Sequence, residues 1–428
     1  MSKESFITYM EKNKLIENEF FDSLRFDLAR VIYYYGENFG NPREKRSSRK
    51  KISKNRIKKF LVKYIIYFKI IKYKKKLKNK PKIISNAYFN LNNELRKLGY
   101  KVFKPIWSLN VHEKIVGDIS LLKETNKIKK FLWTKNFNEL ISTDFLNLVK
   151  VYKSKLKSFY SDQNVIAVIV PFDIPFFENL SLKICKELNI PSFIFLHGLP
   201  HIYSYENYSR SDYLIVWGED LKNLFVKIAG FNKNKIFVSG HPFYTQIQEK
   251  ILRFDLENVL IITYPLAGDN AKKLSRDRGD CILYLLQIQN VLTNLGVKSV
   301  RFRPHPAENP NWYLKILDLS FFKLDMDNLE NSLKKSTLVI GPTSTVFLEA
   351  IYWEVNYVIY EPSQNNINLR GLKLYPPFDG FYPEFPVAKN EIELKSVIEN
   401  KIKVKFSIFH KFIKTPFDLS FIKDLIEE

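Results

Sequence analysis

Cysteine is scarce in this sequence, which has only Cys185 and Cys281 among 428 residues, both in apolar stretches with helical spacing. Two distant thiols give neither a disulfide framework nor the spacing of a metal site, so we expect a reducing, cytoplasmic setting. The N-terminal segment Met1–Lys14 lacks the apolar core of a signal peptide. No apolar run is long enough for a transmembrane helix, so we expect no membrane-spanning segment.

Two common nucleotide-binding motifs are also missing. Neither the glycine pattern of dinucleotide-binding folds nor the P-loop of NTPases occurs, which excludes those two classes of site. Aspartate pairs such as Asp325 and Asp327 stand in no recognisable metal-binding context. We therefore expect neither a metal nor another cofactor.

Acidic residues are outnumbered, since 45 Asp and Glu stand against 68 Lys and Arg and leave a formal net charge of +23. A surplus of this size indicates a polyanionic partner or a bias of composition toward lysine and asparagine. Nucleic acid, anionic lipid and a phosphorylated ligand all fit the first explanation. Composition alone does not separate them.

The distribution of apolar residues predicts an α/β protein. From Val165 onward, short apolar strands alternate with helical stretches, which is typical of parallel, doubly wound sheets. We expect two Rossmann-like domains facing a cleft, spanning 83–250 and 251–428, after a helical basic segment at 1–82. The boundary between the domains falls in the polar stretch Gln246–Asn258, which we expect to be mostly helical.

A hydroxyl-rich turn follows one predicted strand of the second domain. The β-branched run Thr337–Ile340 is broken at Gly341, and Thr343, Ser344 and Thr345 then precede a helix. In an open parallel sheet such a turn lies at the carboxyl ends of the strands, where ligands bind. The helix N-terminus and the hydroxyl groups suit a phosphate, although an ordinary capped helix has the same pattern.

A second phosphate-binding candidate is the loop that begins with Arg303. Arginine and His305 at one strand end, with Pro306 fixing the loop, can grip a phosphate by charge and directed hydrogen bonds. The alternative is a rigid loop with a packed histidine. Glu349, on the helix after the hydroxyl-rich turn, is placed either to bind a ribose hydroxyl or to pair with a lysine.

Polar and glycine residues also end three successive predicted strands of the first domain, namely His197 and Gly198, Gly218, and His241. His197 is the best candidate for a general base because the ordinary pKa of histidine lies near neutrality. Asp173, at the preceding strand end, is an alternative base. A structural histidine bonded to the backbone is the competing explanation for His197, and His241 is either a site residue or a cap.

The basic segment Arg43–Lys80 contains eighteen Lys or Arg and one Glu, with aromatic residues between them. On a helical wheel, one side gathers Phe60, Tyr64, Tyr67, Phe68 and Ile71. Basic amphipathic segments of this kind bind anionic membrane surfaces. A solvated basic helix and a nucleic-acid patch are the alternatives. We expect no nucleic-acid partner, because the rest of the chain has no nucleic-acid-binding module.

Five motifs in fixed order carry a resemblance to a known family. They are IPSFIFLHG, SDYLIVWGEDLKNLFVKIAG, KIFVSGHP, RFRPHP and LVIGPTSTVFLEA, within Val165–Pro362. The order resembles GT-B glycosyltransferases of bacterial surface polysaccharides. It is most similar to capsule-type Kdo and sialic acid transferases and to CDP-glycerol glycerophosphotransferases.

This resemblance implies a metal-independent transferase that moves the sugar of a nucleotide-sugar donor, with a CMP-sugar favoured, to a glycan or lipid-linked acceptor. It implies that His305, Pro306, Ser344 and Thr345 bind the donor's phosphates, and that His197 is the base. The acidic motif that supplies the base in bacterial sialyltransferases is not evident, which weakens a sialic acid assignment. Polyol-phosphate transfer and the non-hydrolysing UDP-sugar 2-epimerases, which share the architecture, stay open. We expect the protein to be cytoplasmic and peripheral at the inner membrane.

Overall fold

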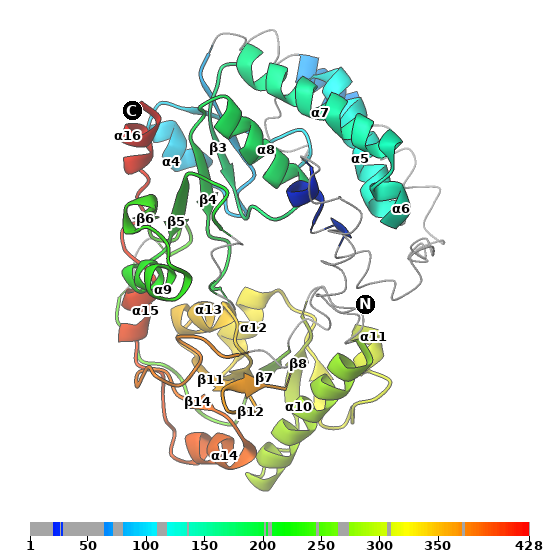
Figure 1. Ribbon diagram of the computed structural model, residues 1–428. Coiled ribbons are helices and arrows are strands. Elements are labelled where there is room, and N and C mark those ends of the chain that lie inside the picture. The colour runs from blue at the N-terminus through cyan, green and yellow to red at the C-terminus, as the bar shows by residue number, and fades with distance from the viewer. Residues whose placement is uncertain are drawn as a thin grey trace.

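The fold consists of two α/β domains, each built on a parallel six-stranded sheet (Figure 1). We describe it from a computed structural model. The described residues are 20–28 without 26, 64–71, 80–108, 118–134, 137–200, 203, 208–244, 248–263, 274–305, 310–369 and 373–427.

The first sheet has the strand order β2-β1-β3-β4-β5-β6, and every neighbouring pair is parallel. Its strands are β1 (Lys82–Ser85), β2 (Lys101–Phe103), β3 (Val165–Val170), β4 (Ser192–Phe195), β5 (Tyr213–Val216) and β6 (Ile236–Val238). Its helices are α4 (Asn92–Lys97), α5 (Ile119–Thr134), α6 (Phe137–Leu140), α7 (Thr143–Asp162), α8 (Phe176–Glu187) and α9 (Glu219–Ala229), with a 3-10 turn η3 (Lys233–Lys235). The central strands are continuous apolar runs because helices cover the sheet.

The second sheet has the order β14-β11-β10-β7-β8-β9 and is also parallel throughout. Its strands are β7 (Val259–Ile262), β8 (Val300–Arg303), β9 (Phe322–Leu324), β10 (Leu338–Gly341), β11 (Asn356–Tyr360) and β14 (Val387–Ala388). Its helices are α10 (Leu274–Asn294), α11 (Pro310–Tyr313), α12 (Leu329–Lys335), α13 (Val346–Tyr352) and α14 (Glu391–Glu399). A small antiparallel pair, β12 (Ser363–Gln364) with β13 (Ile367–Asn368), follows β11.

The predicted α/β fold with two doubly wound, Rossmann-like domains is confirmed by these two sheets. Their packing is continuous, since one hydrophobic core contains residues of both, for example Val168 of the first and Val339 of the second. A second core, which includes Ile261 and Phe302, belongs to the second domain. The two halves therefore meet through packed side chains as well as through loops.

The expected helix in Gln246–Asn258 is wrong for the part that is described, because 248–258 contains no helical residue. Arg253 instead makes an isolated parallel bridge to Val355. Its guanidinium donates to the carbonyl oxygens of Lys334 (2.7 Å) and Trp353 (2.8 Å). These carbonyls lie at the ends of α12 and α13, where helices lack internal donors. An extended linker places Arg253 there.

The N-terminal extension packs on the first domain through segment 20–28. Phe20, Leu24 and Leu28 are buried in the larger core. Asp22 accepts two hydrogen bonds from the guanidinium of Arg210, at 2.8 and 2.7 Å. This bidentate pair fixes the segment on the domain.

The end of the chain returns to the first domain, where Figure 1 shows α15 (Ser407–Phe412) and α16 (Phe421–Glu427) beside its sheet. The N–H of Lys414 donates to the carbonyl of Trp217 at 2.8 Å. The N–H of Asp418 donates to the carbonyl of Ser239, also at 2.8 Å. Both carbonyls lie just beyond strands of the first sheet, so residues after α14 join the two domains.

Gly218, a candidate site residue from the sequence, lies against this returning segment. A Cβ at Gly218 would lie 2.4 Å from the backbone carbon of Phe412, closer than packed atoms approach. Gly240 has a φ of +81°, and a Cβ there would lie 2.4 Å from the Lys414 oxygen. Both glycines therefore allow close approach of the C-terminal segment, which is a packing role.

Within the described ranges, no helix combines the length and the apolar character that crossing a membrane requires.

Candidate functional site

The carboxyl ends of β10, β7 and β8 are neighbours in the second sheet. From β7 the chain adds β8 and β9 on one side and later β10 and β11 on the other, so β7 and β10 flank the switch point where such sheets bind ligands. The turn after β10 and the loop after β8 therefore lie at the same edge of the sheet, on either side of β7. The N–H of His305 donates to Oγ1 of Thr263, at the end of β7, at 3.1 Å.

The three hydroxyl groups of the turn have three different partners. Thr343 donates its hydroxyl to the buried carboxylate of Glu361, which also accepts from the Thr343 N–H at 2.6 Å. Ser344 Oγ accepts from the N–H of Val346 at 3.2 Å and caps the first turn of α13. Thr345 Oγ1 accepts from the first domain. Thr343 is thus turned inward, whereas the hydroxyl protons of Ser344 and Thr345 are not used by these bonds.

Gly341 is a packing residue at the end of β10. A Cβ there would lie 2.3 Å from the Tyr357 hydroxyl and 2.4 Å from a side-chain carbon of Ile262. The same tyrosine donates to the carbonyl of Pro342 at 2.6 Å. A side chain at Gly341 would therefore require the side chains of Tyr357 and Ile262 to move.

The first domain reaches this turn through the loop after β4. The N–H of Leu199 donates to Thr345 Oγ1 at 3.1 Å. A Cβ on Gly198 would lie 3.4 Å from the same oxygen, so the backbone of the loop touches the hydroxyl directly. The structure thus brings His197, Gly198 and Thr345, which were predicted separately, to one place.

His197 is an exposed residue with one ring nitrogen committed to the protein. Its Nδ1 lies 3.1 Å from the carbonyl oxygen of Pro171. A carbonyl only accepts, so Nδ1 carries the proton and Nε2 keeps its lone pair. The surrounding protein desolvates the ring and lowers its pKa, although the bond to Pro171 acts in the opposite direction. The imidazole is therefore largely neutral at pH 7 and has the tautomer that a base acting through Nε2 needs.

His241 has the opposite arrangement. Only 4% of the residue is exposed, and its ring lies among Phe89 (4.3 Å between centroids), Trp217 (4.6 Å) and Tyr244 (4.6 Å). Its Nδ1 accepts from the N–H of Phe243 at 3.1 Å. Burial lowers its pKa to about 3. Of the two roles considered for this histidine, the contacts support the cap.

Asp173 is fully buried. Its Oδ2 accepts from the N–H of Arg210 at 2.9 Å, and the Arg210 guanidinium lies 3.6 Å away. Burial raises the pKa of Asp173 to about 6, although Arg210 opposes this shift. A buried carboxyl group has no direct path to a substrate hydroxyl, so His197 is the better placed base.

Arg303 and Glu349 lie near each other on the second-domain side. Burial raises the pKa of Glu349 to about 7, and the positive charge of Arg303 acts against this shift. Within the described part of the chain, no donor makes a hydrogen bond to the Glu349 carboxylate. A carboxyl group that is neither paired nor fully buried can bind a ligand hydroxyl.

His305 is exposed, and partial desolvation lowers its pKa. Pro306, predicted to bind the donor with it, lies outside the described residues. Among the residues that are described, no group of three or more His, Cys, Asp or Glu is arranged to hold a metal ion.

Glu361 was missed from the sequence. It is fully buried, directly after β11. It accepts hydrogen bonds from Thr343 and from the Asn368 amide (3.3 Å), and so it holds Thr343 of the turn in place. The available signal was an acidic residue directly after an apolar strand, next to the strand that carries the turn. Its partner could not be identified without knowing that β10 and β11 are neighbours.

No protein-family model matches the sequence, and a search of curated proteins found no match. Similar solved structures include UDP-GlcNAc 2-epimerase of Neisseria meningitidis bound to UDP-GlcNAc, with 12% identity over 81% of this chain and 98% of that chain and a TM-score of 0.42. The Methanocaldococcus jannaschii UDP-GlcNAc 2-epimerase has 15% identity over 81% and 98%, with a TM-score of 0.44. The wall teichoic acid polymerase TagF has 14% identity over 87% and 95%, with a TM-score of 0.42. At this level of similarity the matches carry no information about substrate or reaction.

Proposed function

We propose that this protein is a GT-B glycosyltransferase that moves a sugar from a nucleotide-activated donor, with a CMP-sugar favoured, to a surface-polysaccharide or lipid-linked acceptor. The proposal rests on the contact between the loop after β4 and the turn after β10. The loop that carries His197, whose Nε2 keeps its lone pair, contacts the hydroxyl-rich turn through Leu199 and Thr345. The charge of Arg303 acts on Glu349 of the following helix.

The first domain supplies the base in this proposal. Nε2 of His197 removes the proton from the acceptor hydroxyl as its oxygen attacks the anomeric carbon of the sugar. The bond from that carbon to the phosphate oxygen of the nucleotide breaks, and the nucleotide leaves with the electron pair. The lowered pKa of His197 keeps its imidazole neutral at the start of the reaction.

The second domain binds the donor in this proposal. Arg303 and the hydroxyl groups of Ser344 and Thr345 stabilise the negative charge that develops on the leaving phosphate. Glu349 accepts a hydrogen bond from a ribose hydroxyl. His305 adds a directed contact to the phosphate from the neighbouring strand end, beside Thr263.

The basic segment Arg43–Lys80 anchors the protein to an anionic membrane surface. The described helix of this segment, at 64–71, is held to the body by Ile66 and Ile70, which are 7% and 1% exposed. The helix leaves Tyr64 and Phe68 at 58% and 67% exposure. Apolar side chains exposed between lysines suit the boundary between headgroups and acyl chains.

Thermal unfolding with CMP, CDP, UDP, GDP and ADP, on wild type and His305→Ala, tests the donor site. A ligand at about 100 times its Kd adds about 2.7 kcal/mol of stability. Stabilisation by one nucleotide that is weakened in the variant supports the proposal. CMP indicates a Kdo-type or sialic acid donor, CDP a polyol phosphate, and UDP a hexose donor or the 2-epimerase reaction. No shift with any nucleotide contradicts a nucleotide-dependent enzyme and leaves binding through the basic segment as the alternative.

A further inference from the structure

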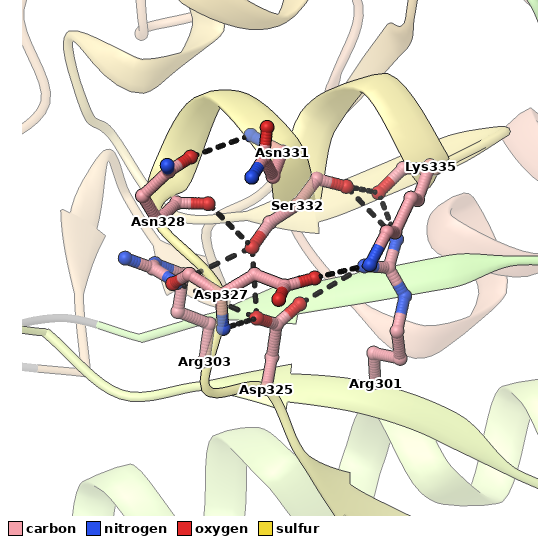
Figure 2. Close-up of polar contacts among 9 residues, drawn as sticks. Arg301, Arg303, Asp325, Asp327, Asn328, Asn331, Ser332 and Lys335 are labelled. Carbon is pink, nitrogen blue, oxygen red and sulfur yellow. Dashed lines mark hydrogen bonds and ion pairs between the residues drawn. The ribbon is translucent and has the colours of Figure 1, made fainter.

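Two arginines of β8 share one buried carboxylate. Figure 2 shows Asp325 between Arg301 and Arg303, beneath the helix that carries Ser332. The side chain of Asp325 is 2% exposed, whereas those of Arg301 and Arg303 are 22% and 20% exposed. Alternate residues of a strand point to the same face, which explains why both arginines reach one acid.

Arg301 uses its guanidinium within the protein. Its Nη1 donates to Asp325 Oδ2 at 3.0 Å. Its Nη2 donates to the carbonyl of Ser332 at 2.9 Å and to Ser336 Oγ at 2.5 Å. Its Nε is buried, and no acceptor among the described residues bonds to it. This arginine ties β8 to α12, and both of its Nη nitrogens donate to acceptors of the protein.

Arg303 is held through Nη1 alone. That nitrogen donates to the carbonyl of Asp327 at 2.5 Å, to Ser332 Oγ at 3.3 Å and to Asp325 Oδ1 at 3.5 Å. No residue in the described ranges accepts a hydrogen bond from its Nε or Nη2, and neither nitrogen is fully buried. The Nε and Nη2 edge of the guanidinium therefore remains free of these bonds at the end of β8.

Asp325 is itself fixed in place. Its Oδ1 accepts from Ser332 Oγ at 2.8 Å and from the N–H of Asp327 at 3.0 Å (Figure 2). A guanidinium is planar and rigid, so several acceptors around one nitrogen restrict the directions of the other two. An arginine held in this way loses less conformational freedom when it binds a phosphate with two parallel hydrogen bonds.

We infer that Asp325 is a positioning residue that presents the free Nε and Nη2 edge of Arg303 to a phosphate of the nucleotide donor. Asp325 does not touch the ligand and acts through Arg303. The inference rests on the proposed function, because it takes the ligand to be a nucleotide bound at the ends of β8 and β10. It assigns different roles to two arginines that look equivalent in the sequence.

A double-mutant cycle on nucleotide affinity tests this role. Isothermal titration measures the Kd of whichever of CMP, CDP, UDP, GDP and ADP binds wild type best, for wild type, Asp325→Asn, Arg303→Met and the double variant. Loss of a charged hydrogen bond weakens binding by about ten- to a hundredfold for Arg303→Met. Asp325→Asn is expected to weaken it by about fivefold, as for a loss of pre-organisation. The double variant is expected to bind like Arg303→Met alone.

Two controls distinguish a positioning role of Asp325 from a role in stabilising the fold. Arg301→Met breaks the same buried network, so it is expected to lower the unfolding temperature while keeping the nucleotide Kd within about twofold of wild type. Asp325→Asn and Arg303→Met are expected not to alter any measurable binding of the matching nucleoside, which lacks the phosphate. If Asp325→Asn does not fold, Ser332→Ala replaces it in the cycle as a milder change to the network that positions Arg303, because it removes one hydrogen bond to Asp325 and the 3.3 Å contact with Arg303 Nη1.

The outcomes decide between the inference and the function on which it rests. Independent effects of Asp325→Asn and Arg303→Met, which multiply in the double variant, overturn the positioning role and leave nucleotide binding intact. An equal loss of affinity in Arg301→Met also overturns it, because the effect then comes from the fold. If wild type binds none of the nucleotides, the proposed function and this inference both fail.

Discussion

The backbone N–H of Leu199 donates a 3.1 Å hydrogen bond to the side-chain oxygen of Thr345, and the two residues belong to different domains. This bond joins the loop of the candidate base to the turn of the candidate phosphate site. A hydroxyl that accepts from one domain still has a proton to donate to a ligand. The hydroxyl proton of Thr345 is therefore not used by the bond to the first domain.

Thr345→Val removes the acceptor while keeping the shape of the side chain. The Leu199 N–H is left without its partner, at a cost of about 1 kcal/mol. We expect a lower unfolding temperature and weaker nucleotide binding, measured by thermal unfolding with and without nucleotide. Thr345→Ser keeps the oxygen and is expected to resemble wild type in both measurements. A Thr345→Val protein as stable and as well stabilised by nucleotide as wild type would contradict the role of this bond.

His197→Gln keeps hydrogen-bonding capacity but removes the base. General-base catalysis contributes about a hundred- to ten-thousandfold, so we expect a loss of that order in the transfer rate with unchanged nucleotide affinity. His241→Gln is the matched control, since that histidine packs among aromatic rings. It is expected to lower the unfolding temperature more than His197→Gln does.

The pH profile gives a second measure of His197. Its pKa is lowered from 6.5 by desolvation, so the active neutral form persists below the pH at which ordinary histidine becomes charged. The transfer rate is expected to fall on acidification with a midpoint below 6.5. An acid limb that stays unchanged in His197→Gln would assign the proton transfer to another group.

The sheets could be predicted because their strands are buried on both faces. For example, β3 (Val165–Val170) is a continuous apolar run in which five of the six residues are buried, and β11 (Asn356–Tyr360) is buried along its whole length. Such runs need no knowledge of distant partners. The strand ends followed directly, and with them the placement of His197, Thr345 and Arg303 at neighbouring loops.

Contacts between distant segments could not be predicted in this way. Gly218 was predicted as a candidate site residue from its place at a strand end. Its contact with the backbone of Phe412 could not be foreseen, because Phe412 lies far along the chain. Thr343 was predicted as a ligand donor, and its bond to Glu361 could not be foreseen because Glu361 is brought there only by the pairing of β10 with β11. Local patterns show which residues are unusual, whereas the tertiary partner decides whether each supports the fold or faces a ligand.

Glu349→Gln tests the electrostatics of the second-domain side. The pKa of Glu349 in the folded protein is about 7, above the ordinary 4.5, because burial penalises its charge. Below pH 4.5 the carboxyl group is neutral in both the folded and the unfolded state, so its burial has no electrostatic cost. As the pH rises through about 7 the group becomes charged in the folded state, and the folded protein loses stability relative to low pH. We expect Glu349→Gln to raise the unfolding temperature at pH 8.5 and to change it little at pH 4.5.

Glu330→Gln, which alters an exposed pair with Lys334, is the control and is expected to have little effect at either pH. A stabilisation that is the same at both pH values would show that the charge of Glu349 is not its source.

The helix at 64–71 allows the membrane proposal to be tested without disturbing the fold. Tyr64 and Phe68 are 58% and 67% exposed, whereas Ile66 and Ile70 hold the helix to the body. Tyr64→Ser with Phe68→Ser is therefore expected to leave the unfolding temperature unchanged and to weaken flotation with phosphatidylglycerol-rich vesicles. Phe381→Ser, at a position 78% exposed in the second domain, is the matched control and should float like wild type.

Each basic residue near an anionic surface contributes about 1 kcal/mol, so binding should also weaken as salt is added. Equal flotation of wild type and the double variant would mean that the apolar face does not enter the membrane, and flotation with pure phosphatidylcholine vesicles would mean that the charge of the segment is not what attracts it.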